Sequence, residues 1–254
     1  NSFRTTDAGL PMLDNSYNQH PVKNDMGLTP DQPFTPDDGN LDPRLDWSVG
    51  RRGIPYWDWG PHTGSDWIRD QSYAGPYSPK KQVYKKSQEG QYTEVGGWTA
   101  GWTANGYRMI RYADVLLMLA ECQIETGDLA GALENINKIR TRAANQDGFV
   151  KNPDGTPAAN YKIGLYTSFA DKDAATYALR MERKLELGME GKRFFDLKRW
   201  GVAITETSRA LAYEKTMSWG TSLYGNATVG PEDLNLPVPQ RQIDLSNGML
   251  VQNR

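Results

Sequence analysis

The sequence is poor in the residue types that build disulfides and many metal sites. It has one cysteine, Cys122, and two histidines, His20 and His62, which stand far apart. A single thiol excludes an intrachain disulfide and a cysteine-based zinc site, and two distant histidines offer little for a histidine-rich metal centre or a Ser-His-Asp triad. Because Cys122 lies inside an apolar helical pattern, we expect it to be a small buried thiol. We predict no metal site and no cofactor.

Positive charge and long apolar runs are scarce as well. The 29 lysines and arginines are outnumbered by 31 aspartates and glutamates, so the net charge is −2. The basic excess that nucleic-acid binding needs is missing, and no nucleic-acid partner is predicted. The longest strongly apolar run, residues 115–120, is far shorter than the roughly 20 residues of a membrane-spanning helix. The chain opens with neither an initiator methionine nor a signal region, so we expect a fragment or a processed form without its targeting information.

The first hundred residues are rich in proline, glycine and tryptophan. Residues 50–67 read GRRGIPYWDWGPHTGSDW, where glycines and prolines rule out a regular helix, and Pro55 and Pro61 argue against a central strand. A second irregular block covers residues 75–107 and includes GGWTAGWTANGY. Irregular segments of this length are uncommon in compact chains and are often functional. We predict that residues 1–106 form a loop-rich, aromatic-rich ligand-binding region.

Helical periodicity starts at about residue 108. RMIRYADVLLMLAECQIETGD (108–128) and LAGALENINKIRTRAA (129–144) place apolar residues three and four positions apart. Met118 and Leu119 widen the apolar surface, so the first helix is expected to be buried on more than one side. Gly127 suits the residue after a helix, and Asp128 suits the N-cap of the next. This pattern predicts a tight helical hairpin that is similar to one tetratricopeptide unit, without its Trp and Pro signature positions.

Charged residues on the expected helices are assigned to solvent-facing positions. Arg111 and Asp114 are expected to form an i,i+3 ion pair on the first helix. A third helix is expected from about residue 171, with Glu182, Arg183 and Glu186 on its solvent side. The RRG stretch at residues 51–53 could contact a carboxylated sugar, but a solvated loop or a backbone clamp is favoured for Arg51 and Arg52.

The last part of the chain combines short helices with an extended end. Helices are expected at 192–201 and 202–216, and the stretch from 234 onward is expected to be extended because of its prolines. Residues 107–254 are thus predicted to be helical and to form one structural unit with the loops. The predicted fold class is mainly α with long irregular loops, in which a tetratricopeptide-like helical hairpin accompanies a loop-rich ligand-binding region.

Several motifs in a fixed order point to a known family. They are RYADVLLMLAE, INKIRTRA, RMERKLELGMEGKRFFDLKRWG and LPVPQRQIDL. Together they resemble the C-terminal half of the SusD/RagB family, nutrient-binding lipoproteins of Bacteroidetes. The segments GRRGIPYWDWG, DWIRDQ, GPYSPKK and GWTAGWTANGY resemble one branch of that family. The resemblance covers the chain from Leu45 onward, and the agreement of several motifs at once makes it specific.

The resemblance implies a non-catalytic binding protein with a SusD-like helical fold. Family members are surface-exposed lipoproteins of the outer membrane that bind oligosaccharides, or in some branches peptides, and pass them to a SusC-like TonB-dependent transporter. Members are considerably longer than this chain, and their N-terminal half carries the lipidated cysteine. Because that half is missing and Cys122 lies in mid-helix, membrane attachment is expected only through a lipid anchor in the absent part of the intact protein.

Aromatic side chains in the loops are the candidate ligand contacts. Trp and Tyr rings offer large apolar area at low entropic cost, and neighbouring polar groups satisfy sugar hydroxyls. The aromatic candidates are Trp98 and Trp102 first, then Trp57, Tyr73 and Tyr77, and the polar candidates are Asp58, Asp66, Arg69 and Asn105. Packing is an open alternative for any single tryptophan, and Trp47, Trp59 and Trp67 are equally well explained as architecture. If the backbone at Trp57 and Trp59 is extended, both rings point to the same side.

Three functional hypotheses follow from these residues. The first is binding of an oligosaccharide, or alternatively of a peptide, without catalysis. The second is a glycoside hydrolase, which needs two carboxylates about 5–10 Å apart. Asp58 with Asp66, or Glu89 with Glu94, could be nominated, although acidic residues are plentiful in any loop. The third is a protein-docking scaffold, because a helical hairpin can offer a groove to a partner.

Overall fold

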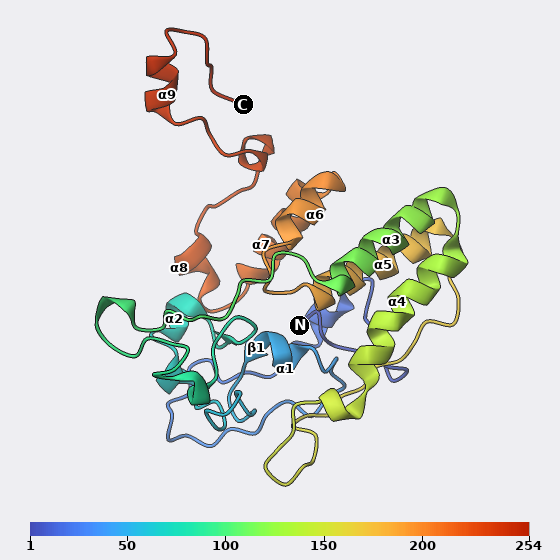
Figure 1. Ribbon diagram of the computed structural model, residues 1–254, viewed down its shortest axis with the longest axis vertical. Coiled ribbons are helices and arrows are strands. Elements are labelled where there is room, and N and C mark those ends of the chain that lie inside the picture. The colour runs from blue at the N-terminus through green and yellow to red at the C-terminus, as the bar shows by residue number, and fades with distance from the viewer. Residues whose placement is uncertain (254) are drawn as a thin grey trace. The chain divides into compact units, whose positions relative to one another are not determined.

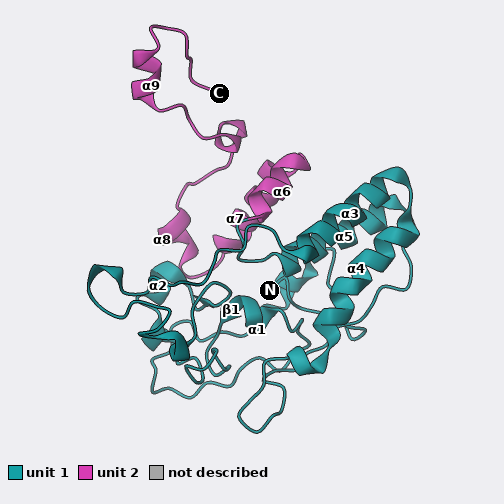
Figure 2. Cartoon of the chain, in the orientation of Figure 1, with its two compact units in different colours: residues 1–191 teal, residues 192–254 magenta. Residues whose placement is uncertain are grey.

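A computed structural model describes residues 1–253 of the 254-residue chain (Figure 1). The described part is mainly helical with long irregular loops, which confirms the predicted fold class. It divides into two compact units, residues 1–191 and residues 192–254 (Figure 2). The predicted division between residues 106 and 107 separates a ligand-binding region from a helical region. This boundary falls inside the first unit, and the division stays a prediction.

The first unit carries short elements before its long helices. The short helices and strands are α1 (Leu45–Ser48), β1 (Val49–Gly50), α2 (Gln71–Ala74) and β2 (Ser78–Pro79). Single 3-10 turns lie at Ser16–Gln19, Ser65–Trp67, Lys86–Gln88, Gly97–Thr99 and Gln146–Gly148. The two strands pair antiparallel, with Val49 opposite Pro79 and Gly50 opposite Ser78. This pair ties the segment before the aromatic turn to the segment that follows it.

The predicted helical hairpin is present as α3 (Tyr112–Thr126) and α4 (Leu129–Ala144). Gly127 ends α3 with a φ of 86°, a left-handed conformation that favours glycine after a helix. Asp128 caps α4, because its carboxylate accepts the Gly131 N–H at 2.9 Å. The first helix starts four residues later than its periodicity predicts, so Ile110 lies outside it and is exposed.

The main core lies between α3, α4 and α5 (Lys172–Glu186), which lie side by side in Figure 1. Its buried residues are Leu116, Leu117, Ala120 and Ile124 of α3, Ala132, Ile136 and Ile139 of α4, and Ala175 and Leu179 of α5. The alanines let the helices approach closely. Met118 and Leu119 are nearly half exposed and Cys122 is exposed. The predictions of a helix buried on several sides and of a buried thiol are therefore wrong, because α4 and α5 cover one face of α3 only.

Buried arginines hold the irregular chain of the first unit together. Arg52 donates to the carbonyls of Thr29, Pro30 and Gln32 at 3.1, 2.7 and 2.7 Å, which is the expected backbone clamp. Arg51 is buried rather than solvated. Its paired N–H groups reach the Asp46 carboxylate at 2.6 and 2.9 Å, a geometry that fits a guanidinium well.

The charged face of α5 is buried, which contradicts the prediction that it meets solvent. Glu182, Arg183 and Glu186 are each no more than 3% exposed. Glu182 accepts from Arg140 of α4 at 2.9 Å and also from Arg44. Arg183 lies 3.0 Å from the Asp114 carboxylate, so Asp114 does not pair with Arg111 as predicted. Long-range partners of opposite charge allow these side chains to lie inside the fold.

The second unit consists of short helices joined by irregular chain. The helices are α6 (Arg193–Arg199), α7 (Ala203–Glu214), α8 (Gly220–Tyr224) and α9 (Gln240–Leu245), with a 3-10 turn at Pro231–Leu234. The first two confirm the helices expected here. The prediction of an extended C-terminal end is wrong where α9 forms. Pro239 stands at the N-cap of this helix, a position at which a proline needs no hydrogen-bond donor. Across residues 1–253, no helix combines the length and the apolar character that crossing a membrane requires.

Candidate functional site

Trp47 is presented at the surface by α1, whose neighbouring side chains are turned inward. Asp46 is fully buried and, besides its bonds from Arg51, accepts the Tyr161 hydroxyl at 2.6 Å. Ser48 is buried as well and donates to the Arg44 carbonyl at 2.9 Å. With both neighbours fixed below it, Trp47 keeps 36% of its surface exposed.

Trp57 stands at the corner of a tight turn. The Tyr56 N–H donates to the Gly60 carbonyl at 2.9 Å, and Pro55 bridges to Pro61 across the turn. Trp57 has a φ of 51°, so the backbone is left-handed here. The Trp57 and Trp59 rings were expected to share one side only on an extended backbone, and the backbone at Trp57 is not extended. Trp59 packs edge-on against the Tyr84 ring and donates its N–H to the Tyr84 carbonyl at 3.3 Å.

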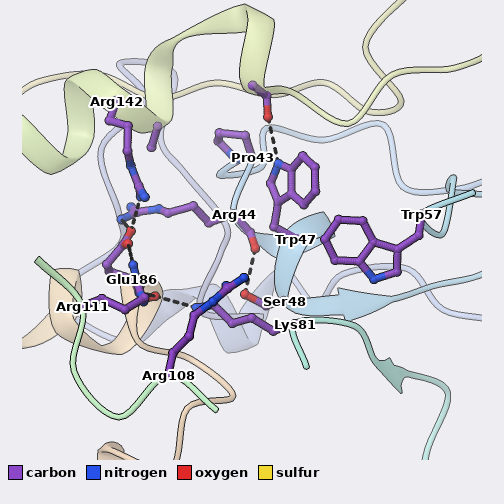
Figure 3. A pocket seen from close by; sticks show the side chains of 12 residues that line it. Pro43, Arg44, Trp47, Ser48, Trp57, Lys81, Arg108, Arg111, Arg142 and Glu186 are labelled. Atoms are coloured by element: carbon purple, nitrogen blue, oxygen red, sulfur yellow. Dashed lines mark hydrogen bonds and ion pairs between the residues drawn. The ribbon is translucent and has the colours of Figure 1, made fainter. Parts of the chain in front are cut away.

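Trp47 and Trp57 form an adjacent ring pair, which is visible in Figure 3. Their ring centres lie 5.2 Å apart with 58° between the planes. Each indole N–H is used to hold its ring: Trp47 donates to the Gly148 carbonyl at 2.8 Å, and Trp57 donates to the Lys80 carbonyl at 3.2 Å. Because both rings are fixed before any ligand arrives, they form a preorganised apolar surface, which we call the tryptophan pair.

Lys80 supports the tryptophan pair from within. Its Nζ lies 5.4 Å from the Trp47 ring centre and 5.6 Å from that of Trp57, distances at which a cation attracts a ring face. The same Nζ donates to the carbonyls of Asp46 and Pro55 at 2.6 and 2.8 Å. Burial lowers the pKa of Lys80 to about 8. Lys80 thus links α1 to the turn that carries Trp57.

A first hollow of about 320 Å³ opens beside the tryptophan pair (Figure 3). Its charged lining consists of Arg44, Lys81, Arg108, Arg111, Arg142 and Glu186. We call it the arginine hollow. Burial acts to raise the pKa of Glu186, but the charges of Arg44, Arg142 and Arg111 outweigh it and lower the pKa. Arg111 donates to both Glu186 and Glu190, and Lys81 donates to the Glu186 carbonyl at 2.7 Å.

A second hollow of about 390 Å³ shares the tryptophan pair as a wall. Its other lining residues include Asp58, Lys85, Ser87, Phe149 and Lys151. Asp58 accepts the backbone N–H groups of Lys86 and Ser87 at 2.6 and 2.9 Å. Desolvation acts to raise the pKa of Asp58, but hydrogen bonds from the Ser87 side chain and from the Ser87 and Lys86 backbone outweigh it and lower the pKa to about 2. An apolar wall thus stands between a cationic hollow and a mixed polar one.

Two of the site residues predicted from the sequence, Trp57 and Asp58, line these hollows. Tyr77 is half-buried, donates its hydroxyl to the Val22 carbonyl at 3.3 Å, and has its pKa raised to about 12 by burial. Packing therefore accounts for Tyr77.

The remaining predicted site residues lie at the surface, away from the lining of both hollows. They are Trp98, Trp102, Tyr73, Asp66, Arg69 and Asn105. Trp98 is fully exposed and Trp102 is 68% exposed, so neither ring packs into the core. Asn105 exchanges side-chain hydrogen bonds with Gln88 at 2.9 and 3.1 Å.

Several residues of the two hollows were not anticipated as site residues. Trp47 is equally well explained as architecture from its sequence context, and Lys80 and Arg142 carry no local signal. The cations of the arginine hollow come from separate stretches of chain, so no short motif contains them. The one usable signal was the pairing of Arg108 and Arg111 just before a helix, in a chain without a basic excess.

Comparisons with known proteins agree on one family. The model of the SusD family matches residues 6–254. A SusD-like protein of Formosa agariphila is 32% identical over 142 residues, which cover 56% of this chain and 23% of that protein. The crystal structure of a SusD superfamily protein from Bacteroides vulgatus is 26% identical with a TM-score of 0.53, over 81% of this chain and 38% of that one.

A further structure shows the same fold. The SusD homolog from Bacteroides thetaiotaomicron is 24% identical with a TM-score of 0.51, over 84% of this chain and 40% of that one. This chain thus spans less than half the length of the relatives that it matches. Since the family model nonetheless matches nearly all of it, the chain belongs to the SusD family.

Proposed function

We propose that this chain is the part of a cell-surface protein that binds oligosaccharide nutrients without altering them. One observation carries the proposal: the Trp47 and Trp57 rings lie 5.2 Å apart, fixed by their own N–H groups, as the wall between two polar hollows. Sugar rings present flat C–H faces that stack on such surfaces, while their hydroxyls need polar partners around the edge. Membership of the SusD family supports glycan uptake as the general role.

The carboxylates of the two hollows support binding rather than hydrolysis. A glycoside hydrolase needs one carboxyl group that holds a proton, which requires a raised pKa. Glu186 and Asp58 line the hollows, and the pKa of each is lowered. Both are therefore ionised at neutral pH and serve as hydrogen-bond acceptors. Neither suits the role of general acid.

The exposed loop around Trp98 and Trp102 is proposed as a second contact for longer oligosaccharides. Both rings face solvent, flanked by Gly96, Gly97 and Gly101. Exposed aromatic rings of this kind favour a binding role over packing. Tyr73 of α2 is 74% exposed and is proposed to act with them.

Delivery of the ligand to a SusC-like TonB-dependent transporter completes the proposal. It rests on family membership. The intact protein is proposed to lie on the outer face of the outer membrane through a lipid anchor. Affinity purification of the tagged full-length protein from its own membranes tests this, with a co-purifying transporter as the expected result and its absence as the contrary one.

The ligand role is tested with Trp47→Ala, Trp57→Ala and the double variant, by calorimetry against a panel of soluble oligosaccharides. Loss of one stacking ring is expected to weaken binding roughly tenfold, and loss of both more strongly. Trp59→Phe is the control, because Trp59 lines neither hollow. Chromatography of the recovered ligand checks that it is intact. Cleaved ligand, or unchanged affinity in a folded double variant, contradicts the proposal.

A further inference from the structure

The arginine hollow carries a surplus of positive charge although the whole chain is slightly acidic. Six cations lie at and behind its wall. Five of them form an ion-pair network, namely Arg44, Lys81, Arg111, Arg140 and Arg142, and the sixth is Arg108. Among residues 1–253, four carboxylates belong to this network, Asp42, Glu182, Glu186 and Glu190. Two positive charges therefore remain uncompensated beside the tryptophan pair. The chain's net charge of −2 makes this a local feature of the hollow.

Arg108 is one of the uncompensated cations. It is exposed, lines the hollow, and forms no ion pair with any residue that the structure describes between 1 and 253. Figure 3 shows its side chain among those that line the hollow, and Arg108 itself belongs to the segment before α3. A guanidinium that has no protein carboxylate keeps all of its N–H donors for solvent or for a ligand.

Arg142 is the second cation with donors to spare. It reaches the Glu186 carboxylate through Nη2 alone, at 2.6 Å, and its side chain is 57% exposed. Glu186 is already bonded to Arg44 and Arg111, so it neutralises Arg142 only in part. Arg108 from the loop and Arg142 from α4 thus line one hollow with free donor capacity.

From this arrangement we propose that the oligosaccharide is anionic and that its sulfate ester or uronate carboxylate binds to Arg108 and Arg142 while a sugar ring stacks on Trp47 and Trp57. The inference rests on the proposed function and specifies its ligand class. A planar guanidinium matches the paired oxygens of a carboxylate or sulfate, and the charge-assisted hydrogen bonds are about twice as strong as neutral ones. A neutral hydroxyl gains less, because it leaves the surplus charge unpaired.

The test begins with a glycan panel in which neutral, sulfated and uronate-containing members are equally represented. Two matched pairs follow by calorimetry: oligogalacturonate against its methyl ester, and a sulfated galactan oligosaccharide against its desulfated form. The anionic member of at least one pair is expected to bind about tenfold more tightly, with a difference that shrinks as salt rises. The pair that shows the difference identifies carboxylate or sulfate as the group bound.

Arg108→Gln, Arg142→Gln and the double variant assign the preference to residues. Each single change is expected to reduce the preference for the anionic member by roughly threefold to tenfold, because the neutral member loses less affinity than the anionic one. Lys162→Gln removes one exposed positive charge outside both hollows and is expected to change neither. Arg108 forms no ion pair that the fold depends on, so its variant keeps the test valid even if Arg142→Gln is destabilised.

The contrary outcomes separate the two proposals. If glycans bind but neutral members bind as tightly as anionic ones, the ligand class is wrong while the binding role stands. The same holds if Lys162→Gln reduces the preference as much as Arg108→Gln does. If no glycan of the panel binds, both proposals fail.

Discussion

The Nζ of Lys80 lies 5.4 Å from the ring centre of Trp47 and is almost fully shielded from solvent. Lys80→Met keeps the length of the side chain but removes its donors to the Asp46 and Pro55 carbonyls. We expect a loss of about 2–4 kcal/mol in the free energy of unfolding, because both carbonyls lose a charged partner. Denaturant unfolding measures it. Lys85→Met, an exposed cation near the same Trp57 ring, should change stability by less than about 0.5 kcal/mol.

Lys80 should also make stability depend on alkaline pH. Burial lowers its pKa from the ordinary 10.5 to about 8 in the folded protein. Between these values the unfolded chain binds a proton that the folded chain has released, so stability rises as pH increases from 8 to 10.5. The gain relative to Lys80→Met should be about 1–3 kcal/mol. If the free energy of unfolding of wild type and of the variant changes with pH in parallel across this window, the lowered pKa of Lys80 is contradicted.

His62 should produce a loss of stability in acid. Burial, with a smaller effect of the Lys80 charge, lowers its pKa from the ordinary 6.5 to about 4. The unfolded chain therefore takes up a proton at higher pH than the folded chain, and stability is lost as pH falls from 6.5 to 4. His62 bonds to the Gly64 N–H at 3.0 Å and to the Ser78 hydroxyl at 2.8 Å, and both bonds suit a neutral imidazole. His62→Gln should flatten this part of the stability profile, measured by unfolding at several pH values.

Arg140 is expected to be among the most sensitive positions for stability. It is fully buried and donates to Glu182 at 2.9 Å, to the Gly9 carbonyl at 2.8 Å and to the Gly164 carbonyl at 2.7 Å. Arg140→Met should cost about 3–5 kcal/mol, because it leaves Glu182 less compensated inside the fold. Lys138→Met, which breaks an exposed pair with Glu134, should cost less than about 0.5 kcal/mol. Similar losses in the two variants would refute the structural role given to Arg140.

A double variant of Trp98 and Trp102 separates ligand binding from packing, because its stability and its ligand affinity are measured independently. The variant that carries Trp98→Ala and Trp102→Ala should keep the free energy of unfolding within about 0.5 kcal/mol of wild type, since both rings are exposed. Affinity for long oligosaccharides should fall about tenfold, and affinity for short ones, which reach only the tryptophan pair, should not change. If the variant binds long and short oligosaccharides as tightly as wild type does, these rings are not part of the site.

The helical part of the fold could be predicted because its signals are local. The 129–144 pattern matches α4 at both ends, and Gly127 with Asp128 marks the turn before it. The buried charges of α5 could not be predicted, because their partners are distant in sequence. Arg44 and Glu182 are 138 residues apart, and a hydrophobic pattern treats both as solvent-facing.

The candidate site, like the fold, could be predicted only where its signal is local in the sequence. Trp57 and Asp58 were anticipated because an aromatic-rich turn is itself a local signal, and both line the hollows. Trp47 joins them only through the contact between α1 and the turn, which depends on the buried Lys80. Arg108 and Arg142 meet across a loop and a helix, so their shared hollow exists only in the folded chain.

Trp57 occupies a backbone conformation that bulky residues rarely adopt, with a φ of 51°. A residue with a Cβ atom in this region costs about 1–2 kcal/mol relative to glycine. Glycine would relax the turn, yet it would delete half of the ring surface. The strained backbone and the contacts of the ring therefore pull this one position in opposite directions: glycine would relieve the turn but lose the ring contact with Trp47 and the hydrogen bond to the Lys80 carbonyl, together with the surface on which the proposed ligand stacks.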